Sequence, residues 1–129
     1  YGSISGTANA YSSRGGTYVK IGKSVTIYFW VDPVTTTAIS GNVQVGDLPF
    51  PVATQQSTAQ YGGSIGWWNN LAVAYESLGW FCVSSSKFGL YGSKAPSGMT
   101  TSQAVPITDC SSGAPDLYGC VIHYYTTTP

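Results

Sequence analysis

The chain has 129 residues with a formal net charge of zero, 8% charged residues and 14% aromatic residues. Five Lys and Arg residues balanced by five Asp and Glu residues provide no strong basic patch, which excludes nucleic acids and anionic membrane surfaces as electrostatic partners. Disordered chains are poor in aromatic residues and rich in charge, so this composition predicts a folded chain, and the length is that of one ordinary domain. No apolar run approaches the roughly 18 residues that span a bilayer, so no membrane insertion is expected.

The first strong strand pattern covers residues 25–31. Every odd-numbered side chain from Val25 to Val31 is apolar, a period of two that places these side chains on one face of a strand. The opposite face carries Thr26, Tyr28 and Trp30, which are β-branched or aromatic. Both faces are therefore predicted to be covered, one by the core of the domain and the other by a second surface such as a neighbouring subunit.

The remaining strands are predicted from short apolar runs between turn signals. Asp32 and Pro33 are predicted to begin a loop, since aspartate before proline commonly starts a turn. Pro49 and Pro51 are predicted to end strand pairing, because proline lacks the donor that a strand ladder requires. Further strands are expected at residues 41–45, 79–83, 87–91 and 118–126, with a short strand near 104–107. In the last long strand, Cys120, Ile122 and Tyr124 fall on one side, and Val121, His123 and Tyr125 on the other.

Residues 62–75 allow two interpretations. The runs 62–68 and 71–75 flank Asn69-Asn70, a pair that tolerates left-handed backbone, and so predict a hairpin. The side chains of Leu71, Ala74, Tyr75 and Leu78 also fit one face of a helix. Gly, Pro or Ser/Thr clusters interrupt almost every other window, so no helix of ordinary length is predicted elsewhere, and regularly spaced strands favour an all-β sandwich or barrel.

The sequence Trp67-Trp68-Asn69-Asn70 is the strongest candidate for ligand binding. Adjacent tryptophans on a strand point to opposite faces, so one is predicted to be buried and the other to be exposed or at an interface. An exposed ring stacks on the apolar face of a pyranose while amides bind its hydroxyls, which is the usual chemistry of sugar recognition. The alternative is a hairpin tip with purely structural aromatic residues. Further candidates of the same kind are Tyr61, Trp80 and Tyr91.

No residue pattern indicates catalysis or a bound cofactor. Residues 62–66 have nucleophile-elbow spacing around Ser64, but a strand-like segment rather than a helix follows. Cys120 and His123 have zinc-ligand chemistry, but their spacing on a strand points them to opposite faces. The five carboxylates are scattered, and no spacing indicates two facing acid groups. We therefore expect a protein that is not an enzyme and that binds neither metal nor cofactor.

Two motifs resemble a known family. Tyr18-Val19-Lys20-Ile21-Gly22 precedes the strand at 25–31, and Gly46-Asp47-Leu48-Pro49-Phe50 follows it. In this order and spacing they resemble segments of the C-terminal head or knob domains of bacteriophage tail fibres and tailspikes. The resemblance implies an antiparallel, jelly-roll-like β-sandwich that forms a homotrimer, with residues 1–129 as a single head domain in the C-terminal part of a longer chain.

The resemblance also implies a function and a location. Such heads attach the virion to host cell-surface polysaccharide, commonly lipopolysaccharide or capsule, so the expected partners are a host glycan and further copies of the chain. The expected location is the phage tail of the virion, after synthesis in the host cytoplasm. Low charge and doubly apolar strands suit an obligate interface along a threefold axis. The residues predicted for this interface are Tyr28, Trp30, His123 and Tyr125.

Two other functions are compatible with the sequence. One is a trimerisation or folding-clamp domain that caps a fibre without contacting the receptor. The other is a carbohydrate-binding module of a secreted protein, which we expect to be monomeric and to use a disulfide. The three cysteines, Cys82, Cys110 and Cys120, have no CxxC spacing, and a phage structural protein folds in reducing cytoplasm. Free thiols are therefore expected, with a Cys110–Cys120 disulfide as the alternative.

Overall fold

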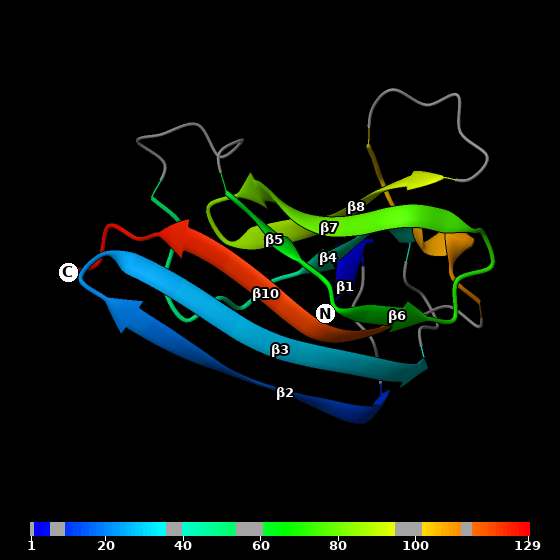
Figure 1. Cartoon of the computed structure of the whole chain (residues 1–129), viewed down its shortest axis with the longest axis horizontal. Coiled ribbons are helices and arrows are strands. Elements are labelled where there is room, and N and C mark those ends of the chain that lie inside the picture. The colour runs from blue at the N-terminus through cyan, green and yellow to red at the C-terminus, as the bar shows by residue number, and fades with distance from the viewer. Residues whose placement is uncertain (1, 6–9, 36–39, 54–60, 95–101, 112–114) are drawn as a thin grey trace.

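A computed structural model shows one curled antiparallel sheet (Figure 1). It describes residues 2–5, 10–35, 40–53, 61–94, 102–111 and 115–129. The strand order is β1-β4-β8-β7-β5-β10-β3-β2, with β6 beside β10 and β9 beside β8. The strands are β1 (Gly2–Ser5), β2 (Ala10–Ile21), β3 (Ser24–Thr35), β4 (Ser40–Val45), β5 (Gly62–Ser64), β6 (Trp67–Asn69), β7 (Tyr75–Ser84), β8 (Lys87–Lys94), β9 (Gln103–Ala104) and β10 (Asp116–Tyr125).

The predicted all-β class is confirmed. The described residues contain no α-helix, and η2 (Ile107–Asp109) is a single 3-10 turn. The helical alternative for residues 71–78 is wrong, because β7 begins at Tyr75. Within the same described ranges, no helix is long and apolar enough to cross a membrane.

The hairpin of β2 and β3 brings the two sequence motifs together. Its tight turn contains Gly22 at φ 56°, a left-handed conformation that glycine adopts without steric cost. The rings of Tyr18 and Phe50 meet edge to face at 5.5 Å, and the Lys20 ammonium lies 5.4 Å from the Phe50 ring centroid. The hydroxyl of Tyr124 donates a hydrogen bond of 2.9 Å to the Phe50 carbonyl. The segment after β4 is thereby fastened to the hairpin.

The predicted alternation along β3 is confirmed. Its odd-numbered side chains from Val25 to Val31 face the core, whereas Tyr28 and Trp30 are exposed on the opposite face. The predicted loop at Asp32-Pro33 is wrong, because β3 continues to Thr35. Pro33 lies opposite a β-bulge in β2, where the register of the two strands shifts, and a bulge tolerates the missing donor of proline.

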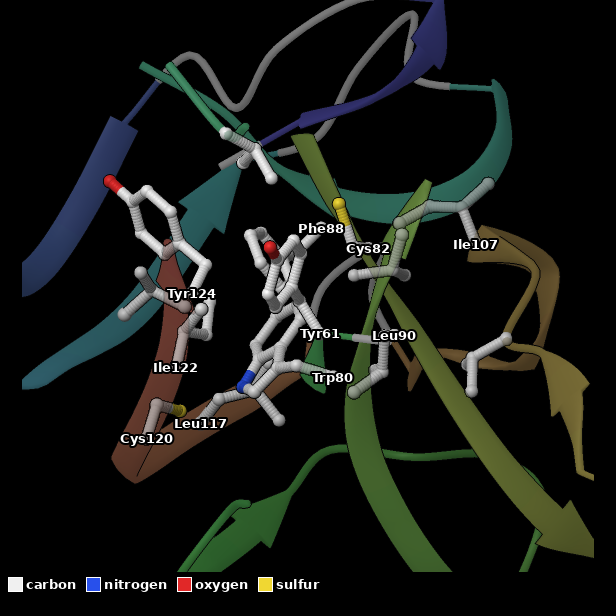
Figure 2. Close-up of a cluster of buried hydrophobic side chains, with 14 of the residues drawn as sticks. Tyr61, Trp80, Cys82, Phe88, Leu90, Ile107, Leu117, Cys120, Ile122 and Tyr124 are labelled. Carbon is white, nitrogen blue, oxygen red and sulfur yellow. The ribbon is translucent and has the colours of Figure 1, made fainter. Parts of the chain in front are cut away.

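The core fills the inner face of the curl, where β7 and β8 lie opposite β3 and β10 (Figure 2). Two ring contacts join these sides, at 5.4 Å between the centroids of Phe29 and Trp80 and 5.9 Å between those of Phe88 and Tyr124. The predicted buried side of the last strand is confirmed. The fully buried side chains on these strands are Val25, Cys82, Phe88, Leu90, Leu117, Cys120, Ile122 and Tyr124.

The strand β5 pairs with β7 on one side and with β10 on the other. At its centre Gly63 lies opposite Ile122, and a Cβ atom there would collide with the backbone carbonyl of Val121. Glycine is therefore the residue that allows the two halves of the curled sheet to join through β5.

The predicted hairpin over residues 62–75 is wrong. The strand β6 pairs with the first residues of β10, and Leu71 forms a bridge to Cys110. The backbone N–H of Gly66 lies within hydrogen-bonding distance of the carbonyls of Tyr118 and Gly119, at a bulge where Gly119 has φ 60°. The partner strand comes much later in the chain, so the local spacing around Asn69-Asn70 predicted the wrong pairing.

A buried hydrogen-bond network fixes the turn η2. The Tyr75 hydroxyl donates to Asp109 Oδ2 at 2.6 Å, and Lys94 Nζ lies 2.8 Å from the same oxygen. Burial by itself raises the pKa of Asp109, but the hydrogen bonds from Lys94 and Tyr75 outweigh it and lower the pKa. The short strand predicted near residues 104–107 is confirmed only in part. The strand β9 covers Gln103–Ala104, whereas Ile107 belongs to the turn η2.

The three cysteines are free, buried thiols, as expected, and no Cys110–Cys120 disulfide is present. Burial raises the pKa of Cys110 to about 12 and that of Cys120 to about 11. Because the thiolate is the reactive form, these groups are unreactive at neutral pH and act as small core side chains.

Candidate functional site

The candidate ligand site lies on the outer face of the sheet, the face turned away from the core. It is at the end where β10 begins beside β6 and where β3 ends (Figure 1). The pairing of β6 with β10 places Trp67 opposite Tyr118. The register of β10 with β3 brings Asp116 beside Asp32. Three segments far apart in the sequence thus contribute to one surface.

Polar contacts tie these side chains together. The Tyr118 hydroxyl donates to Asp32 Oδ2 at 3.1 Å, and Asn70 Nδ2 donates to Asp116 Oδ2 at 2.7 Å. Asp116 is only 9% exposed, and its buried Oδ1 atom has no hydrogen-bond partner among the described residues. Two carboxylates on neighbouring strands with one unpaired oxygen are an unfavourable arrangement, since like charges at opposed positions repel.

The two carboxyl groups differ in pKa. Burial raises the pKa of Asp116, and the nearby charge of Asp32 raises it further, against the lowering effect of Asn70. The pKa of Asp32 is lowered, first by the adjacent Ser12 hydroxyl and also by the hydrogen bond from Tyr118, which outweigh partial desolvation. The pair therefore holds a proton on Asp116 more readily than an isolated aspartate does, while Asp32 carries the negative charge.

We expect Asp116→Asn to stabilise the protein at neutral pH. A raised pKa means that the protonated Asp116 contributes stability below the pKa of the unfolded chain, and that this contribution is lost as pH rises through the folded pKa. An amide stays neutral and can still accept the hydrogen bond from Asn70. The expected gain is up to about 1 kcal/mol at pH 7, shrinking toward pH 4. Thermal unfolding across this pH range measures it, and a less stable variant at pH 7 would contradict the like-charge interpretation.

The aromatic part of the site is open to solvent. Trp67 is 52% exposed, and its ring centroid lies 5.4 Å from that of Tyr118 at an interplanar angle of 59°. Asn70 has φ 60°, a left-handed conformation that aims its amide at Asp116. A flat ring beside several hydrogen-bond acceptors can stack on one face of a sugar while it binds hydroxyl groups at the rim.

The structure separates the residues predicted for ligand binding. Trp67, Asn69 and Asn70 are exposed at the site, and Trp68 points inward and packs against the core, as expected of adjacent tryptophans. Trp80 is 3% exposed and Tyr61 is also buried, which removes both from the candidate ligand residues. Tyr91 lies on β8 in ring contact with Phe81, away from the other candidates.

No sequence pattern indicates three residues of this site, namely Asp32, Asp116 and Tyr118. The pattern at Asp32-Pro33 predicts the start of a loop, and the spacing of the five carboxylates indicates no pair. One signal could have indicated two of these residues, because Asp116 and Tyr118 lie at the start of the last strand, where binding residues are often found. Their proximity to Asp32 depends on the register of β10 with β3, which no local pattern contains.

The four residues predicted for an interface between subunits lie together on the outer face of β3 and β10. With Val19 and Phe81 on neighbouring strands they form a surface that we call the outer apolar face. His123 Nδ1 lies 3.1 Å from Thr26 Oγ1. Trp30 lies across Gly15, and its indole N–H donates to Ser13 Oγ at 2.8 Å. The residues of the outer apolar face are Val19, Tyr28, Trp30, Phe81, His123 and Tyr125.

A cavity of about 430 Å³ opens on the other side of the β2–β3 hairpin, between the inner face of these strands and residues 45–49. Its walls are mostly apolar, including Phe29, Leu48 and Ile122, and its charged groups are Arg14 and Asp47. Part of the second sequence motif therefore forms one wall of this cavity. Of the residues predicted for ligand binding, none lines it.

Comparison of the chain with protein-family models, curated proteins and solved structures finds no match. A functional conclusion therefore depends on the geometry of the site and on the sequence motifs.

Proposed function

We propose that this chain is the receptor-binding head of a bacteriophage tail fibre or tailspike, which attaches the virion to host cell-surface polysaccharide. In this proposal the curled sheet is a jelly-roll-like β-sandwich, and three copies associate through the outer apolar face. The location is the phage tail of the virion.

The observation that carries the glycan part of the proposal is the exposed Trp67 ring beside Asp32, Asn70 and Tyr118. An exposed tryptophan costs solvation and contributes little to stability, so its position among polar groups on strand ends is typical of a binding surface. The like-charge pair beneath it is a second unfavourable feature in the same place, as expected where function opposes stability. The phage part of the proposal depends on the resemblance of the two motifs.

Trp67→Ala is expected to weaken binding to host cells and to glycans. Stacking of a ligand on an aromatic side chain contributes roughly 1–3 kcal/mol per ring. The dissociation constant of the variant for the glycan should therefore rise about tenfold to a hundredfold. Trp67→Phe keeps a flat ring and should retain most of the binding. The measurements are adsorption of labelled protein to host cells and a glycan array. Full binding by a folded Trp67→Ala variant would refute this site.

A second candidate function is a trimerisation clamp without receptor contact, which the outer apolar face favours. A clamp requires assembly and is indifferent to Trp67, so the adsorption experiment distinguishes the two functions. The third candidate, a secreted carbohydrate-binding module, is less well supported because the three cysteines are free.

A further inference from the structure

Hydrogen-bond acceptors of the candidate site are open to a ligand, whereas two of its donors are engaged within the protein. The Tyr118 hydroxyl donates to Asp32, and the Asn70 amide donates to Asp116. The Oδ1 atom of Asp116 is an unpartnered acceptor on a side chain that is nine-tenths buried, and the carboxyl group faces Asp32. A carboxylate has about four acceptor positions and an amide oxygen has two. Asp32 accepts from Tyr118 and Asn70 acts only as a donor to Asp116, so the side-chain oxygens of Asp32 and Asn70 have acceptor positions left beside the exposed Trp67 ring.

The site also carries negative charge, and within the described ranges no cation forms an ion pair with Asp32 or Asp116. The groups that act on Asp32 and Asp116 are Ser12, Tyr118, Asn70 and each other. Lys94 forms its ion pair with Asp109, beside the turn η2. An anionic ligand would therefore bring a third negative charge next to two carboxyl groups, whereas hydroxyl and ammonium groups would supply the missing donors.

We propose that the site around Trp67 binds a neutral or amino-bearing pyranose and rejects sugars that carry a carboxylate or phosphate. This inference rests on the proposed function and names the class of glycan. The Trp67 ring stacks on the apolar face of the sugar, and Asp32 accepts hydrogen bonds from its hydroxyl or ammonium group. The indole ring also favours an ammonium group through its negative face.

The test uses pyranosides that differ in one group: the methyl glycosides of glucose, glucosamine and glucuronic acid, and the corresponding galactose series. Dissociation constants come from NMR titration of the whole chain in low salt. In the series that binds, the uronic acid should bind at least about tenfold more weakly than the neutral sugar, the effect of one unfavourable unit charge near a protein surface. The amino sugar should bind at least as tightly as the neutral one, and added salt should weaken its binding.

Asp32→Asn should bring the amino-to-acidic affinity ratio toward one, because it keeps an acceptor oxygen and removes the charge. Glu76→Gln is the matched control. It removes the same charge from an exposed position on β7 and should leave the ratio unchanged. General damage to the fold changes all affinities together and does not move this ratio.

A uronic acid that binds as tightly as the neutral sugar and shifts the Trp67 signals would overturn this inference and leave the proposed function standing. An unchanged ratio in Asp32→Asn would also overturn it. If no pyranoside and no saccharide on a glycan array binds, the proposed function itself fails, and the inference fails with it.

Discussion

Trp80→Ala is expected to lower the free energy of unfolding by about 3–5 kcal/mol, a large part of the total stability of a domain of this size. Trp80 is buried, its ring contacts Phe29, and Figure 2 shows its indole next to Leu117 and Cys120. Truncation leaves a cavity between β7 and β10 that the surrounding strands cannot fill. Urea denaturation, followed by circular dichroism, measures the change.

Two further substitutions test whether burial is the cause. The indole N–H of Trp80 is a buried donor beside the Cys120 thiol, whose pKa is raised by burial and lowered, to a smaller extent, by this N–H. Trp80→Phe removes this donor and keeps much of the ring, so it should cost far less than alanine. Trp67→Ala, at an exposed position, should change stability by less than about 1 kcal/mol. A Trp80→Ala protein that stays fully stable but no longer binds glycan would restore Trp80 as a ligand residue.

If the proposed trimer forms, Tyr28→Ala is expected to convert it into monomers at micromolar concentration. Central aromatic residues of an interface commonly contribute about 2 kcal/mol or more each, and a trimer would lose three copies at once. Tyr28 lies in the middle of the outer apolar face and is 47% exposed within one chain. Trp30→Ala is less suitable for testing the interface, because the contacts of Trp30 with Ser13 and Gly15 also stabilise the β2–β3 hairpin.

Light scattering at several concentrations measures the assembly, with an expected mass near three times 13.6 kDa for the unaltered chain. The matched control is Tyr18→Ala. Tyr18 is 49% exposed on the adjacent strand β2, but on the opposite face, against Phe50. Loss of assembly in both variants would point to general destabilisation, and a monomeric unaltered chain would remove the trimer from the proposal.

The partners of the short strands could not be predicted from the sequence. Alternation identified the inward and outward sides of the 25–31 strand and of the last strand, because each pattern is complete within a few residues. The segment 62–75 was different. Its glycines and asparagines predicted a turn, but β5 and β6 are held by β10 from the end of the chain.

For the candidate site, the sequence identified the exposed aromatic and amide side chains of Trp67, Asn69 and Asn70 from their residue types. It failed on Trp80, because Leu78, Trp80 and Cys82 alternate with Phe81 and Val83, so both faces of this segment carry apolar side chains and a period of two does not say which face is buried. Only the curl of the sheet, which places β7 over β10, buries that ring.

The sequence by itself determined the all-β class and the two faces of the long strands, since composition and a period of two act locally. The tertiary structure alone decided the pairing of Asp32 with Asp116 and the contact between the two motifs at Phe50. Both depend on the register of strands distant in sequence. Register is set by the packing of the whole core, and one residue of slip would place every side chain on the other face.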